Sequence, residues 1–261
     1  KWYGRIIRDG NENPVAIREE ADASKSEKNI NEIFTGIMIA ENEFLKTGLK
    51  GLLRNNKAGE YYLTDLVDYA SKRQVKIGST QTTEKEVLGA NNKEELAALY
   101  EALISLNVKE AKRKGVIFKD ESTCYVEGTL KVGKDVQIGN NVTIKGSVKL
   151  GNNVSIESNV VLSNVKIGEN SIVKNFCSIE NSLIAKNVEV GPFARLRNGA
   201  VLDDSAKVGN FVEVKQTKVG AGSKVNHHAY LGDTKIGKKV NIGAGTITCN
   251  YDGKVKHKTT I

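Results

Sequence analysis

Residues 126–162 read VEGTLKVGKDVQIGNNVTIKGSVKLGNNVSIESNVVL. An aliphatic residue stands at every sixth position of this stretch, at Val126, Val132, Ile138, Ile144, Leu150, Ile156 and Leu162. Six residues are enough for one short strand and one turn, and the Gly-Asn-Asn runs at 139–141 and 151–153 accept the positive φ of tight turns. The period therefore predicts a parallel β-helix of hexapeptide repeats, in which three strands make a coil and the aliphatic side chains point inward.

The same period extends through most of the second half of the chain. It slips by one residue and resumes at Ile167, Val190, Val219 and Ile236. Each coil inserts several Val or Ile side chains, and each of these contributes about 1.5–3 kcal/mol when it is buried. One coil cannot hold a core by itself, so we expect the coils of residues 116–261 to stack around one continuous core. The spacing does not determine the handedness of the helix.

The first part of the chain lacks this period. Its apolar pattern predicts a strand, a helix, a second helix and a short strand, at Thr35–Ala40, Asn42–Leu53, Leu63–Ala70 and Val75–Ile77. This alternation is typical of an α/β unit, which we place at residues 1–91.

A helix is predicted to join the two parts. Asn92 with Glu95 three positions later forms a capping box, and Gly115 follows the last apolar position. We expect residues 92–115 to be the linker helix, with the domain boundary near Gly115.

Composition and charge restrict the partners and the compartment. The net charge is +8, but the Lys residues are scattered and no basic run has interleaved aromatics, which favours a small anionic substrate over nucleic acid. The three Cys residues stand in no CxxC or CxxH spacing, which argues against disulfides and structural zinc and fits a cytoplasmic protein. The most apolar stretch, residues 33–40, is too short to span a membrane. The chain begins without an initiator Met and reads as a fragment.

Two cations interrupt the regular pattern late in the chain. Arg197 lies in the run GPFARLRNGA, and Lys215 lies one full coil further on, in GNFVEVK. We therefore expect the two side chains to stack on adjacent coils. A guanidinium next to an ammonium favours binding of a phosphate. Two solvated cations on a basic surface are the alternative.

A histidine pair follows these cations. His227 and His228 stand in the run NHHAY, and an imidazole beside paired cations can act as a general base. A metal site is less expected, because adjacent strand residues point to opposite faces. The period then ends in a loop, CNYDG at 249–253, whose amides and hydroxyls could hold a substrate or stabilise an oxyanion.

At these residues the chain resembles a known enzyme family. The runs are WYGRIIRD, EIFTGI, EYYLTD, GANN, GPFARLRNGA, VGNFVEVK, HAYLGD and VNIGAGTITCNYDG. They are similar to bacterial bifunctional N-acetylglucosamine-1-phosphate uridyltransferase / glucosamine-1-phosphate N-acetyltransferase. The resemblance implies a Rossmann-like nucleotidyltransferase domain followed by a left-handed parallel β-helix, and a homotrimer that binds acetyl-CoA between subunits.

The resemblance also implies roles for particular residues. His227 is the base for the sugar amine, Glu213 its orienting carboxylate and Asn250 a donor to the thioester oxyanion. Arg197 and Lys215 hold the sugar phosphate, Tyr230 and Asn241 contact the sugar, and Lys256 lies near the phosphate. Acetyl-CoA is contacted by Ala244, Asn250 and Tyr251. His228 stands where the family usually has Leu.

For uridylyl transfer, the resemblance implies that Gly4, Glu19 and Asn91 contact the sugar nucleotide, and that Asn91 is also a Mg²⁺ ligand. Phe34 replaces an Asn of the family and cannot make its hydrogen bond to the sugar. The family's Gly-rich phosphate loop and second metal ligand precede residue 1, and further coils with part of the coenzyme A site follow Ile261. We therefore expect the chain as given to lack uridyltransferase activity.

The leading hypothesis is acetyl transfer from acetyl-CoA to glucosamine-1-phosphate, coupled in the family to uridylyl transfer from UTP, which makes UDP-N-acetylglucosamine for cell-wall precursors. A sugar-nucleotide pyrophosphorylase with a non-catalytic β-helix assembly module is the alternative, and it leaves His227 and Asn250 unexplained. A purely structural solenoid is a third hypothesis. It predicts a uniform outer ladder, which the break at Asn250–Lys258 does not fit.

Overall fold

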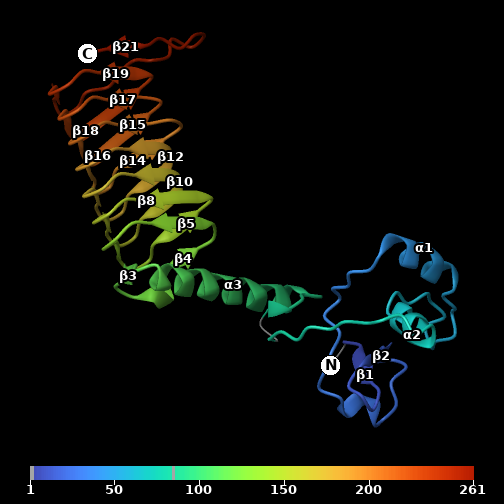
Figure 1. The fold of residues 1–261 in the computed structure, drawn as a ribbon. Coiled ribbons are helices and arrows are strands. Elements are labelled where there is room, and N and C mark those ends of the chain that lie inside the picture. Colours follow the sequence, from blue (N-terminus) through green and yellow to red (C-terminus); the bar gives the residue numbers. More distant parts are fainter. Residues whose placement is uncertain (1–2, 84–85) are drawn as a thin grey trace. The chain divides into compact units, whose positions relative to one another are not determined.

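The computed structural model describes residues 3–83 and 86–261. The chain divides into two compact units, Lys1–Gly89 and Ala90–Ile261. The first unit contains a small antiparallel sheet and two helices, and the second contains a long helix and a β-solenoid (Figure 1).

In the first unit, strand β1 (Arg5–Arg8) pairs antiparallel with β2 (Pro14–Arg18). A short 3-10 helix, η1 (Glu27–Asn29), follows. Helix α1 (Asn42–Lys50) and helix α2 (Asp65–Lys72) confirm the two predicted helices. Leu66 of α2 is buried at 1% exposure, and α2 packs against β2. Within the described residues of this unit the sheet is antiparallel and two-stranded, so the Rossmann-like arrangement is not seen in them.

The two strands predicted for this unit are wrong. Residues 35–40 and 75–77 have no regular secondary structure. Ile37 and Ile39 are 74% and 96% exposed. A strand requires a neighbour for its backbone hydrogen bonds. Among the described residues of the unit only β1 and β2 form strands, so the apolar run at 35–40 has no strand to pair with.

Helix α3 (Lys93–Arg113) begins as predicted. The Asn92 side chain accepts a hydrogen bond from the Glu95 amide at 2.9 Å, and Glu95 in return accepts from the Asn91 amide at 2.7 Å, one residue earlier than in a standard capping box. Gly115, with φ of +94°, follows the helix end. Ile104, Val108 and Ala111 are buried against the first coil. The helix therefore lies with the second unit and covers the start of the solenoid.

The solenoid is built from short parallel strands joined at tight corners, as the period predicts. After β3 (Ile117–Phe118) and the 3-10 helix η3 (Glu121–Thr123), its strands are β4 (Tyr125–Val126), β5 (Thr129–Val132), β6 (Gln137–Ile138), β7 (Thr143–Lys145), β8 (Ser147–Leu150), β9 (Ser155–Ile156), β10 (Val161–Ile167), β11 (Ile172–Val173), β12 (Ser178–Ile184), β13 (Glu189–Val190), β14 (Arg195–Arg197), β15 (Val201–Leu202), β16 (Lys207–Lys215), β17 (Lys218–Val219), β18 (Lys224–Gly232), β19 (Thr234–Ile236), β20 (Asn241–Ile242) and β21 (Thr259–Thr260).

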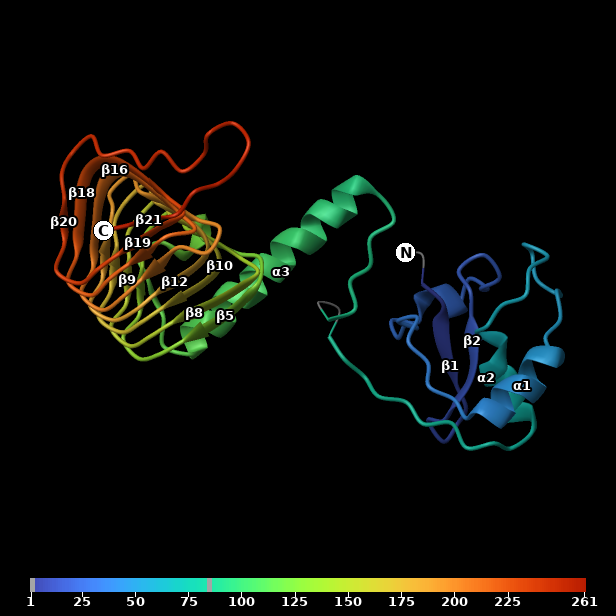
Figure 2. The same ribbon diagram turned by 90° about the horizontal axis from the view of Figure 1, so that it is seen from above.

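Each strand pairs with the strand one coil away, so that the coils stack into one solenoid (Figure 2). The inward aliphatic residues therefore form columns around one core. Leu162 lies opposite Ile144 in the preceding coil and Ile179 in the next. All three side chains are at most 1% exposed. The coil from Ile144 to Leu162 is thus one residue longer than the coil from Leu162 to Ile179, and this difference accounts for the slips in the sequence period.

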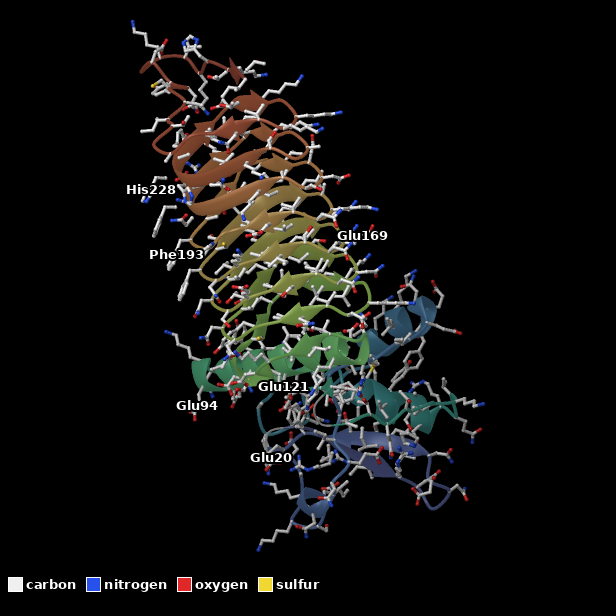
Figure 3. All side chains as sticks on the ribbon, turned by 90° about the vertical axis from the view of Figure 1, so that its left-hand side faces the viewer. Glu20, Glu94, Glu121, Glu169, Phe193 and His228 are labelled. Carbon is white, nitrogen blue, oxygen red and sulfur yellow. The ribbon has the colours of Figure 1, made fainter. Side chains whose placement is uncertain are left out.

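One corner column of the solenoid changes from amides to aromatic rings. Asn141 and Asn159 have φ of 54° and 60°, and the Asn141 amide donates to the Asn159 side-chain oxygen at 3.2 Å. The following corners are occupied by stacked rings, 4.8, 5.2 and 5.1 Å apart between centroids, at Phe176, Phe193, Phe211 and His228. Figure 3 shows Phe193 and His228 projecting from the same edge. We call these four residues the aromatic column.

Candidate active site

The candidate site is formed by three strands of consecutive coils, β14, β16 and β18. Arg197 of β14 lies opposite Lys215 of β16, which confirms the predicted stacking of the two cations. Lys215 in turn lies opposite Gly232 of β18, and Glu213 lies opposite Tyr230. Because parallel strands keep their residues in register, this part of the site is set by main-chain pairing.

Each cation has its own carboxylate. Arg197 Nε donates to Glu213 Oε1 at 2.6 Å, and this hydrogen bond raises the pKa of the Arg197 guanidinium. Lys215 Nζ lies 3.8 Å from Asp233 Oδ2. The spacing in the sequence suggested two cations without counter-charges. In the structure each of them is instead paired with a carboxylate. The terminal nitrogens of Arg197 have no protein hydrogen bond among the described residues, so they remain available to an anion.

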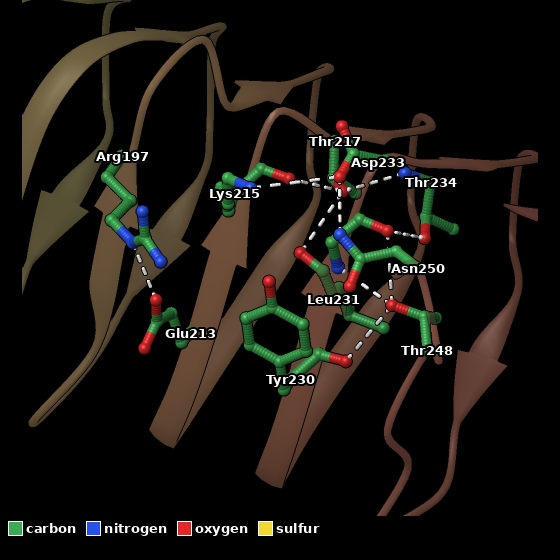
Figure 4. A network of polar contacts seen from close by, with 11 residues as sticks. Arg197, Glu213, Lys215, Thr217, Tyr230, Leu231, Asp233, Thr234, Thr248 and Asn250 are labelled. Carbon is green, nitrogen blue, oxygen red and sulfur yellow. Dashed lines mark hydrogen bonds and ion pairs between the residues drawn. The ribbon is translucent and has the colours of Figure 1, made fainter. Parts of the chain in front are cut away.

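Asp233 connects the stacked cations Arg197 and Lys215 to the loop that ends the repeats (Figure 4). Its side chain is 9% exposed, and Oδ2 accepts a hydrogen bond from Asn250 Nδ2 while facing Lys215. A Cβ at Gly232 would lie 2.7 Å from Asn250 Nδ2, so the close approach of the loop requires glycine there. The sequence reading missed Asp233. The sequence did hold a signal for it. Asp233 directly follows the Gly that ends a strand, at a corner where most other coils have Asn.

Buried threonines hold the loop against the last coils. Thr248 Oγ1 accepts from the Gly232 amide at 2.8 Å and lies 3.4 Å from the Tyr230 carbonyl. Thr217 Oγ1 accepts from the Thr234 amide at 3.0 Å. These hydroxyls form hydrogen bonds with backbone groups at the point where the regular strand pairing ends. They thereby fix the position of Asn250 relative to Lys215.

The two adjacent histidines occupy different environments. His227 is exposed, and its Nδ1 lies 2.6 Å from Oδ1 of Asn210, its register partner on β16. His228, with φ of 42°, turns its ring onto Phe211 in the aromatic column. Glu213, predicted to orient His227, is instead ion-paired with Arg197.

The remaining residues assigned to acetyl transfer lie on β20 and on the loop. Asn241 pairs with Lys224 at the start of β18. Gly245, next to Ala244, donates its amide to the His228 carbonyl at 2.9 Å. The structure therefore brings the turn at residues 243–246 next to the histidine pair.

Tyr251 and Lys256 form an isolated antiparallel bridge in the protruding loop. Among the described residues no hydrogen bond or ion pair joins either side chain to Arg197 or Lys215. Hydrogen bonds from the Val255 amide, His257 and the Lys254 amide lower the pKa of Asp252 to about 2, so this carboxylate is ionised at neutral pH and organises the loop.

In the first unit, the structure brings Gly4 and Glu19 together. A Cβ on Gly4 would lie 3.4 Å from Glu19 Oε2, and Glu19 Oε1 accepts from the Thr64 hydroxyl at 2.8 Å. The Phe34 amide donates to the Gly4 carbonyl at 2.8 Å, which places Phe34 beside this pair. Asn91 belongs to the second unit, so the structure does not place it relative to Gly4 and Glu19.

The described residues do not form a magnesium site around Asn91. Its side-chain nitrogen donates to Glu95 at 3.2 Å, and within residues 3–83 and 86–261 no three His, Cys, Asp or Glu side chains cluster as metal ligands. Magnesium prefers near-octahedral oxygen coordination, to which one amide oxygen contributes little. In the same described ranges, none of the helices has the length and apolar character needed to cross a membrane.

The stacked parallel strands place the protein in a structural class. Residues 111–214 match the family model described as the EIF2B subunit epsilon LbH domain. The second unit is a parallel β-solenoid of the left-handed β-helix type, with a polar site built across consecutive coils.

Curated relatives identify the family more narrowly. The chain is 48% identical over 261 residues to the bifunctional protein GlmU of Nitrosomonas eutropha and 46% identical over 260 residues to that of Acinetobacter baylyi. Each match covers 99% of this chain and 57% of the relative's length. GlmU of Neisseria meningitidis is 44% identical over 174 residues. The chain belongs to the GlmU family.

Solved structures that match part of the chain include a UDP-N-acetylglucosamine acyltransferase from Francisella novicida, at 17% identity and a TM-score of 0.34, matched over 51% of this chain and 64% of that one. LpxA from Acinetobacter baumannii is 16% identical with a TM-score of 0.29, matched over 49% and 65%.

Proposed function

We propose that this protein transfers the acetyl group of acetyl-CoA to the amine of glucosamine-1-phosphate. The observation that carries the proposal is the stacking of Arg197 on Lys215 in consecutive coils, with the exposed imidazole of His227 on β18, the strand that pairs with β16. The relationship to GlmU supports the same reaction. A structural solenoid would need neither the buried Asp233–Asn250 contact nor the cations beside it.

In this reaction the cations bind the sugar phosphate and thereby position its amine. The terminal guanidinium nitrogens of Arg197 and the Lys215 ammonium meet the phosphate, while Glu213 and Asp233 hold the two cations in place. Tyr230 and Asn241 contact the sugar ring, and Lys256 reaches the phosphate from the loop.

His227 accepts a proton as the amine nitrogen attacks the thioester carbonyl. The C–N bond forms, the C–S bond breaks, and the proton passes on to the departing coenzyme A thiolate. Asn250 uses one Nδ2 proton for Asp233 and has a second for the developing oxyanion. Ala244 and Tyr251 contact the coenzyme.

For the first unit we propose a role in binding a sugar nucleotide, in keeping with uridylyl transfer and a Rossmann-like nucleotidyltransferase domain in the family. The support is the adjacency of Gly4 and Glu19. The Phe34 backbone amide donates to the Gly4 carbonyl, so the position that departs from the family lies beside this pair. No step is assigned to Mg²⁺, because the described residues form no cluster of metal ligands around Asn91.

Replacing Arg197 by Ala should raise KM for glucosamine-1-phosphate by about 10- to 100-fold with a smaller change in kcat. The phosphate contact is made in both the ground state and the transition state, so its loss weakens binding more than it slows chemistry. Steady-state kinetics at saturating acetyl-CoA measure both constants. Arg113→Ala, which removes the same charge at the end of α3, is the matched control. A loss confined to kcat would contradict phosphate binding by Arg197.

We also propose that the protein is a homotrimer. His227 and the aromatic column are exposed on the single chain, with Phe176 and Phe211 each 52% exposed, so a neighbouring subunit could cover this edge and complete the site. Sedimentation velocity at high micromolar concentration should give three times the mass of the chain. A single monomeric species under these conditions would refute the trimer.

A further inference from the structure

The contact between Asn210 and His227 has a chemical consequence for the imidazole. Nδ1 lies 2.6 Å from the Asn210 side-chain oxygen, and it is the one side-chain hydrogen bond of His227 among the described residues. A neutral imidazole carries a proton on one nitrogen and a lone pair on the other, whereas an amide oxygen only accepts. A hydrogen bond to this oxygen therefore requires the proton on Nδ1 and leaves the lone pair on Nε2.

The backbone on one side of this pair is held very close. A Cβ on Gly209 would lie 2.0 Å from the Asn226 carbonyl oxygen. Strands β16 and β18 can therefore approach this closely only because residue 209 is glycine. Asn210 and His227 are the residues that follow directly in each strand. Their separation is therefore set by the main chain.

The other side of the pair is held by stacked rings. Phe211 and His228 directly follow Asn210 and His227, and their ring centroids are 5.1 Å apart. The contact between Asn210 and His227 thus lies between a glycine-dependent backbone approach and an aromatic stack. Such support on both sides is what a precisely oriented side chain requires.

We propose that Asn210 is a positioning residue that fixes the Nδ1–H tautomer of His227, so that Nε2 is the basic nitrogen. This inference rests on the proposed acetyl transfer for its kinetic meaning. In the step, Nε2 takes the proton of the attacking amine as the C–N bond forms and the C–S bond of acetyl-CoA breaks. The Nδ1 proton stays on its hydrogen bond to Asn210, and Nε2 then gives its proton to the thiolate.

A neutral partner suits this role better than a carboxylate. A negative charge next to an imidazole favours the imidazolium and raises its pKa, which would fill the basic site with a proton. The carboxylate of Glu213 lies opposite Tyr230 rather than His227, and it accepts a 2.6 Å hydrogen bond from Arg197. The amide of Asn210 orients the ring without that electrostatic effect.

The tautomer can be measured without any assay of activity. The protein, expressed from its complete gene with ¹⁵N-labelled histidine, should show the protonated-nitrogen shift at Nδ1 of His227 near neutral pH. The signal is assigned by its loss in His227→Ala. In Asn210→Ala the population should move towards the Nε2–H form. An Nε2–H tautomer in the unmodified protein, or an unchanged spectrum in Asn210→Ala, overturns the proposal.

Kinetics then test whether the tautomer matters. Asn210→Ala should lower kcat about 10- to 100-fold with little change in KM, since the ring is misoriented and its lone pair misplaced. Asn210→Asp restores the acceptor and should recover most of the turnover, with the acid limb of the pH profile moved to higher pH. A purely structural role predicts equal losses in both variants and an unshifted profile.

The two failures are distinguishable. Should the unmodified protein show the Nδ1–H tautomer but transfer no acetyl group, the proposed function fails while the tautomer assignment stands. Should it transfer acetyl groups and Asn210→Ala keep full turnover, the positioning role fails while the function stands.

Discussion

If the proposed acetyl transfer holds, replacing His227 by Ala should lower its turnover number by about 10²–10⁴, with little effect on KM for glucosamine-1-phosphate. Glucosamine-1-phosphate carries an ammonium at neutral pH, and only the free amine attacks a thioester, so a base near the nitrogen has a proton to accept. In the proposed reaction the phosphate is bound by Arg197 and Lys215, which pair on adjacent strands apart from the imidazole, so substrate binding should stay intact. Release of the coenzyme A thiol, followed with a thiol reagent, measures the rate.

The matched control for this experiment is the neighbouring histidine. His228 turns its ring onto Phe211 in the aromatic column, whereas His227 contacts Asn210. His228→Ala removes the ring stacked on Phe211 but leaves the Asn210 contact of His227 in place, so it should lower turnover far less than His227→Ala. Near-normal turnover in His227→Ala together with loss of activity in His228→Ala would mean that the base has been assigned to the wrong residue.

The second large effect concerns stability. Leu196→Ala should destabilise the solenoid by about 2–5 kcal/mol, because a large buried side chain is lost and a cavity remains. Leu196 is 0% exposed and stacks between Ile179 and Val214 of the adjacent coils. Urea denaturation followed by circular dichroism gives the change in unfolding free energy.

Leu183→Ala is the control for this second experiment. It makes the same chemical change on β12, but the Leu183 side chain is 44% exposed. Its loss should cost less than about 1 kcal/mol. Equal destabilisation by the two substitutions would show that Leu196 does not stabilise the core through its burial.

The sequence predicted the parts of the fold that depend on local pattern. The six-residue period placed inward residues such as Ile144 and Leu162, and the capping box at Asn92 placed the start of α3. It failed at residues 35–40, where an apolar run resembles a strand but no strand pairs with it among the described residues. Hydrogen bonding between strands is not a local property, so local pattern cannot supply it.

The sequence predicted those contacts of the candidate site that follow from an 18-residue coil. Arg197 and Lys215 stand one full coil apart and stack as expected. The coil between β16 and β18 is one residue shorter, which brings Asn210 to His227 and Glu213 to Tyr230. The family resemblance, not the register, assigned the orienting role to Glu213, and the register places Asn210 rather than Glu213 opposite His227. Asn210 also resembles the many corner asparagines, which hid it until the register was known.

The variable coil length also determines how a gene for this protein can change. The step from Thr129 to its partner Ser147 is one residue longer than the step from Val161 to its partner Ser178, so a single codon gained or lost at a corner is absorbed there. The same change inside a strand reverses which side chains face inward. Duplication or deletion of a whole coil preserves every pairing above and below it. The scaffold can therefore evolve in length by discrete steps, while the spacing of strands β14, β16 and β18 is inherited unchanged.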